Sequence, residues 1–113
     1  WPARTILRHL ADCEIAFGYR IRQVLTVDNY EMQPFDQEKW AHPYDTFSGQ
    51  HALEVFIAVR GWNLALLKTL PPQDMERKTN HPERGAMTLR TLLESIAGHD
   101  INHLLQLERI RGL

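Results

Sequence analysis

The sequence predicts an all-α protein of the up-and-down four-helix-bundle type. Apolar residues recur at three- and four-residue intervals along three long segments, and no segment has the alternating pattern of a half-buried strand. The expected helices cover about residues 3–26, 50–70 and 88–111. Three helices with broad apolar faces leave a bundle core open, so we expect an N-terminal helix to be missing from this chain or supplied by a partner.

Length and composition limit the function. The 113 residues suit a single domain, residues 1–113, and 43% of them are hydrophobic. The 13 basic and 14 acidic residues form no basic stripe, so we expect no nucleic-acid partner. No apolar run approaches the ~20 residues of a spanning helix, so we expect no membrane partner. A single cysteine rules out an internal disulfide, no signal peptide is visible, and we expect a cytoplasmic protein.

The first helix is expected to start after Pro2, a residue suited to a first helical turn. His9 lies at the edge of its apolar face, one turn from Cys13, which we interpret as a small core residue. The stripe itself consists of Ile6, Leu10, Cys13, Phe17, Ile21 and Val24.

Turn-forming residues make 27–49 a long connection, with one short helical turn expected at 36–40. The second helix is stopped by Pro71 and Pro72. On its inward side, Arg60 can pair with a carboxylate at the bundle edge or hold a substrate anion.

The polar stretch 73–86 leaves room for a short extended segment, in which His81 is expected to be solvated. Thr88 is the expected N-cap of the last helix. That helix carries His99 and His103 where its apolar stripe should continue. Residues four apart lie about 40° apart around a helix and about 6 Å along it, so both imidazoles can share one metal ion.

A hydrogen-bonded pair of core histidines is the alternative to a metal site. Buried imidazoles need partners for both nitrogens, and two in succession favour a metal site. His9 is the natural candidate for a third ligand.

An ordered set of motifs resembles the DinB/YfiT-like family of bacterial four-helix-bundle proteins. The family's first helix has no counterpart in this chain. The resemblance covers nearly all residues and rests on Trp1-Pro2, His9-Leu10-Ala11-Asp12-Cys13-Glu14, Arg20, Phe56, Arg60, His99-Asp100, His103 and Gln106-Leu107.

The resemblance implies a divalent metal bound by His9, His99 and His103, with zinc or nickel as first candidates and iron, manganese or copper as others. It further implies a thiol S-transferase or a hydrolase that acts on a small thiol or another small molecule. A homodimer is also implied.

Three histidine ligands leave coordination positions open, as in catalytic sites. Such a site can activate either water or a thiol, so the ligands alone do not choose between the two reactions. Asp12, Arg60 and Gln106 are candidates for orienting the ligands or lining the pocket, and no catalytic residue is assigned. Asp100 and Asn102 are expected to point away from the metal.

A non-catalytic bundle is the competing interpretation. In it the three-histidine site is vestigial, and the domain is a stress-linked or interaction module. It predicts a folded protein without bound metal.

Overall fold

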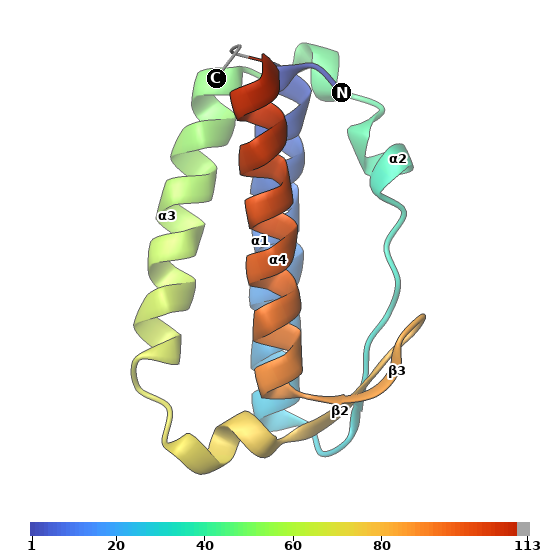
Figure 1. Cartoon of the computed structure of the whole chain (residues 1–113), viewed down its shortest axis with the longest axis vertical. Coiled ribbons are helices and arrows are strands. Elements are labelled where there is room, and N and C mark those ends of the chain that lie inside the picture. The colour runs from blue at the N-terminus through green and yellow to red at the C-terminus, as the bar shows by residue number, and fades with distance from the viewer. Residues whose placement is uncertain (111–113) are drawn as a thin grey trace.

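The computed structural model describes residues 1–110, which form a bundle of three long helices and one short one (Figure 1). The long helices are α1 (Ala3–Thr26), α3 (Gly49–Leu67) and α4 (Leu89–Ile110), and the short helix is α2 (Gln37–Ala41). Helix α1 packs against both α3 and α4. The all-α bundle class expected from the sequence is therefore confirmed.

The long connection after α1 sets the direction of α3. It leads the chain back along the bundle through α2 and a short 3₁₀ turn, Tyr44–Thr46. As a result, α1 and α3 run in the same direction and α4 runs in the opposite one (Figure 1). The successive long helices α1 and α3 therefore do not alternate in direction as the expected up-and-down order requires, because the long connection returns the chain to the end at which α1 begins. Asp36 caps α2 by accepting a hydrogen bond from the Lys39 amide.

A close approach between α1 and α3 depends on Gly18. A Cβ at this position would lie 2.6 Å from Oδ1 of Asn63, which is only 3% exposed. Because Gly18 has no side chain, the Asn63 amide can lie against α1. There its Nδ2 donates to Oε2 of Glu14.

A small sheet lies at the end of the bundle opposite the N-terminus, where α4 begins (Figure 1). It has the order β1-β2-β3, with β1 parallel to β2 and β2 antiparallel to β3. The sequence predicted a short extended segment in 73–86, which contains β2, and no strand elsewhere. The expected absence of other strands was wrong. The three strands are too short for an alternating pattern to emerge. They are Tyr30–Glu31, Lys78–His81 and Gly85–Thr88, and a 3₁₀ turn at Pro72–Glu76 precedes β2.

The main hydrophobic cluster lies where α1 and α4 meet this sheet. Its most buried members are Val24 and Leu89, both 0% exposed, with Ile21, Met32 and Leu92 around them. This cluster fixes α4 against α1 and thereby sets the relative position of the histidines farther along the two helices.

The observed helix ends follow from local chemistry. Helix α1 has the predicted bounds, whereas α3 ends at Leu67, three residues before the predicted end. Because Leu70 precedes a proline, it is disfavoured in the α conformation, and the last turn tightens. Thr88 caps α4, since its Oγ1 accepts from the Thr91 amide at 3.3 Å. The predicted end of the last helix at 111 lies outside the described residues.

Large apolar side chains remain exposed on helices α3 and α4. They are Ile57, Trp62 and Leu64 on α3, and Ile101, Leu104, Leu105 and Ile110 on α4.

None of the described helices is long and apolar enough to cross a membrane.

Candidate metal centre

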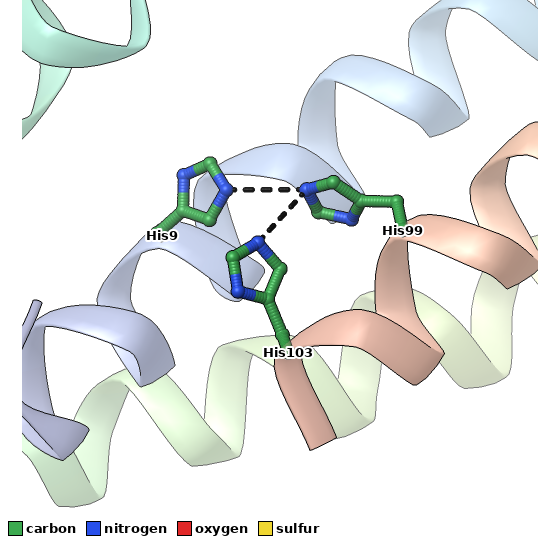
Figure 2. A group of neighbouring side chains, drawn as sticks. All are labelled: His9, His99 and His103. Atoms are coloured by element: carbon green, nitrogen blue, oxygen red, sulfur yellow. Dashed lines mark hydrogen bonds between the residues drawn. The ribbon is translucent and has the colours of Figure 1, made fainter. Parts of the chain in front are cut away.

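Three imidazoles converge between α1 and α4. Nε2 of His9 and Nε2 of His103 each lie 3.2 Å from Nε2 of His99. Figure 2 shows the three rings pointing toward one another, His9 from α1 and the other two from α4. One nitrogen of each ring lies within 4.8 Å of the others, so the structure brings the three predicted ligands together. We call His9, His99 and His103 the three-histidine cluster.

Partners behind two of the rings decide where the ring protons lie. Nδ1 of His99 is 3.1 Å from Oδ1 of Asp100, and Nδ1 of His103 is 2.6 Å from Oε1 of Gln106. A carboxylate and an amide oxygen only accept, so Nδ1 of each neutral ring must carry the proton. Both Nε2 atoms then present lone pairs to each other across 3.2 Å.

The donor set fits a divalent ion. Metal–nitrogen distances of ~2.0–2.1 Å at tetrahedral angles place neighbouring ligand nitrogens about 3.3 Å apart. The two 3.2 Å separations match that value. Two facing lone pairs repel, and a cation between them removes the repulsion.

The environment favours the neutral form of His9 and of His103. Burial, followed by the nearby His103 and His99, lowers the pKa of His9 from 6.5 to about 4. Burial also lowers the pKa of His103. Neutral imidazole is the form that binds metal, so His9 and His103 are prepared for a cation at neutral pH.

Aromatic rings enclose the cluster on two sides. The Trp1 ring meets His9 edge-on at 4.8 Å between centroids, and Phe17 meets His99 edge-on at 5.4 Å. His9 is 2% exposed, whereas the side chain of His99 is 27% exposed. The cluster is therefore accessible from the His99 side.

Cys13 lies beside the cluster and stays a thiol. Its Sγ is 3.4 Å from Nε2 of His9, and the residue is 2% exposed. Burial, together with nearby Asp12 and Asp100, raises the pKa of the thiol to about 12. A buried neutral thiol is a poor nucleophile, in keeping with its interpretation as a core residue.

Arg60 reaches the cluster through a carboxylate. Its Nη2 donates to Oε1 of Glu14 at 2.9 Å and also to Oδ2 of Asp100. Oδ1 of the same Asp100 contacts Nδ1 of His99. Glu14 on α1 and Arg60 on α3 therefore hold the carboxylate that contacts the His99 ring on α4. Burial disfavours charge on Asp100, yet the hydrogen bonds from His99 and Arg60 hold its pKa below its usual value.

Of the other two residues proposed to orient the ligands, one lies at the cluster and one does not. Gln106 lies behind His103, as described above. Asp12 instead accepts a 2.5 Å hydrogen bond from the hydroxyl of Tyr44, which anchors the connection to α1. Asp100 was expected to point away from the metal, and its carboxylate indeed lies behind His99, at Nδ1, where Arg60 from another helix holds it.

Glu14 was not singled out by sequence. It is 3% exposed and accepts from both Arg60 and Asn63. A charged residue on the buried side of an apolar stripe was the only signal that could have revealed it.

Fold and cluster together define a class: a helical-bundle protein whose three histidines form a candidate site for a divalent ion. The chain belongs to the DinB superfamily, which its sequence matches over residues 1–107.

Relatives agree with this class. A protein of Oceanobacillus iheyensis, provisionally named a metal-dependent hydrolase, is 31% identical over 105 residues. A Bacillus mycoides protein with the same provisional name is 27% identical over 112 residues. These matches cover 92% and 98% of this chain. The chain spans only 61% and 65% of the lengths of these two relatives.

A solved structure is also similar. YfiT from Bacillus subtilis, described as a probable metal-dependent hydrolase with an unusual four-helix bundle topology, aligns with a TM-score of 0.83 and 28% identity. The alignment covers 99% of this chain and 67% of YfiT.

Proposed function

We propose that this chain binds one divalent metal ion through His9, His99 and His103, as the metal-binding part of an enzyme that activates water or a thiol. The observation that carries the proposal is the pair of Nε2 atoms of His99 and His103 facing each other across 3.2 Å. Asp100 and Gln106 lie behind these rings, where each accepts from Nδ1 of a neutral imidazole.

Three ligands from the protein leave room for a further one. A divalent ion in such a site supplies an acidified water or a stabilised thiolate at neutral pH. The chain's own residues orient the imidazoles and keep His9 out of water, while the partly exposed His99 marks the side from which a substrate approaches.

Hydrolysis and thiol S-transfer both suit this site. The provisional names of the relatives favour hydrolysis. Cys13 is buried as a neutral thiol, so a transferred thiol would come from a small molecule. Zinc and nickel are our first candidates, because imidazole suits both ions.

Elemental analysis of tag-free protein tests the metal. We expect near-stoichiometric metal in the parent and almost none in the His99→Ala/His103→Ala double variant. A matched control is His42→Ala/His51→Ala, which removes two exposed histidines outside the cluster and should keep the metal. Loaded protein would then be assayed with a panel of esters and of thiol–electrophile pairs.

An equally low metal content in the parent and both double variants would contradict the proposal. The protein would then be a non-catalytic helical bundle, an interaction or stress module with a vestigial three-histidine cluster. Loss of metal in the His42→Ala/His51→Ala control alone would place the site elsewhere.

A further inference from the structure

Two small cavities open beside His99, with volumes of about 110 and 210 Å³. They share four lining residues, so we treat them as two parts of one cleft, called the His99 cleft. The shared residues are Phe17, Arg20, His81 and His99. The two volumes together reach the lower end of the ~300–1,000 Å³ range of small-molecule pockets.

Arg20 is an unusual residue in the wall of this cleft. It is 8% exposed, and none of the described residues offers it a carboxylate within ion-pair distance. Its Nη2 donates to the Gln33 carbonyl at 2.8 Å, and its guanidinium carbon lies 5.2 Å from the Phe35 ring centroid. These contacts occupy a single donor of the five on a guanidinium. A nearly buried guanidinium without a counter-ion has donors left to bind an anion that enters the cleft.

Two further donors face the same cleft. Arg84 lines the smaller cavity, where its Nη1 donates to Ser95, and it too lacks a carboxylate partner among the described residues. Nδ1 of His81 accepts from the amides of Glu83 and Arg84 at 3.1 and 3.2 Å. That nitrogen is therefore unprotonated, which leaves the ring proton on Nε2 as a donor. His81, expected to be solvated, is half-buried instead.

Among the described residues that line the cleft, one carries a carboxylate: Glu83, an exposed residue in the larger cavity. Two guanidiniums and one carboxylate give the cleft an excess of positive charge, and the recessed Arg20 excludes a wide polymer such as a nucleic acid. A small molecule with an oxyanion at one end fits this arrangement.

We propose that the His99 cleft binds a small-molecule substrate bearing a carboxylate or phosphate, with that oxyanion on Arg20 and Arg84 and its reactive end at the three-histidine cluster. The proposal rests on the proposed function for the reactive end, whereas the oxyanion subsite depends only on protein side chains. Guanidinium groups recognise planar carboxylates and phosphates by paired, charge-assisted hydrogen bonds.

Calorimetric titration tests the subsite. Metal-free and zinc-loaded protein are each titrated with succinate and with its neutral analogue succinamide, and metal-free protein also with inorganic phosphate. We expect succinate, but not succinamide, to bind in both forms. Arg20→Gln should weaken succinate binding about 10-fold or more, because charged hydrogen bonds are lost. Arg84→Gln should weaken it less, since Arg84 is exposed.

Arg90→Gln is the matched control, because it removes the same charge from an exposed pair with Glu76 outside the cleft. Equal succinate affinity in the parent, Arg20→Gln and Arg90→Gln would overturn the subsite. Binding confined to zinc-loaded protein and unaffected by Arg20→Gln would place the anion on the metal and also overturn it.

Two further outcomes keep the test decisive. If Arg20→Gln loses its helical circular dichroism, Arg84→Gln becomes the deciding variant: weakened binding supports the subsite, and unchanged binding overturns it. If the protein takes up no metal yet binds succinate through Arg20, the proposed function fails while the oxyanion subsite stands.

Discussion

Asp100 Oδ1 lies 3.1 Å from Nδ1 of His99, on the opposite edge of the ring from the nitrogen that faces His103. A carboxylate in this position holds the proton on Nδ1, fixes the ring orientation and makes the ligating nitrogen more basic. Asp100 is therefore a positioning residue for His99, and Arg60 in turn positions Asp100.

Replacing Asp100 should weaken metal binding without unfolding the protein. We expect Asp100→Asn to lower metal affinity about 10- to 100-fold, as loss of such outer partners typically does. Competition with a coloured chelator measures the affinity, and circular dichroism checks the fold. Asp45→Asn, at an exposed position outside the cluster, is the control. Equal affinities in the two variants would mean that Asp100 does not position His99.

Removing the Arg60 guanidinium should cost stability. Arg60 separates two carboxylates whose side chains are 4% and 16% exposed, Glu14 and Asp100. Arg60→Gln leaves both without their cation, so we expect a loss of about 2–4 kcal/mol, reduced by the partial exposure of Arg60. Urea denaturation measures this loss. The Arg60→Gln/Glu14→Gln double variant should recover part of it, and a loss below about 0.5 kcal/mol would contradict the role.

Acid should destabilise the metal-free protein through His9. The pKa of His9 is 6.5 when unfolded and about 4 when folded. Between these values the unfolded chain binds more protons, so stability falls as the pH drops from about 6.5 to 4 and then levels off. The contribution is roughly 3 kcal/mol, and His9→Gln should remove it. Urea titrations of both proteins at about pH 7, 5.5 and 4.5 check this, and parallel stability profiles would refute it.

Two glycine substitutions should have opposite effects. Gly18→Ala places a methyl group against the buried Asn63 amide, and we expect it to cost about 1–3 kcal/mol. Gly61→Ala, on α3 with open space around the new Cβ, should stabilise by about 0.5–1 kcal/mol. Thermal unfolding followed by circular dichroism separates the two. A stable Gly18→Ala protein would show that α1 and α3 do not need this close approach.

Local pattern was enough to predict the helices. The stripe from Ile6 to Val24 predicted α1, and Thr88 was recognisable as the N-cap of α4. The sheet escaped prediction because Tyr30 pairs with Thr79, and so short a pairing between distant segments leaves no local signature.

The three histidines could be predicted from local pattern, whereas the residues that hold them in place could not. His99 and His103 lie on one helix face, and His9 was the candidate third ligand because it lies at the edge of the apolar face of the first helix; the family resemblance implied the same three residues. Asp100 acquires its role through Arg60 of α3, a contact that spacing along α4 does not encode. The substrate class, a homodimeric state and a cytoplasmic location stay predictions.

The cluster joins residues 90 positions apart, and β1 pairs with β2 across 49. Closing loops of this length costs chain entropy. We therefore expect these contacts to form after the local helical turns. Helical signal should consequently appear early during refolding, while competence to take up metal should appear only when α4 docks on α1. An ion that binds solely to the docked state also holds it there by mass action, which would tie the lifetime of the native chain to metal supply.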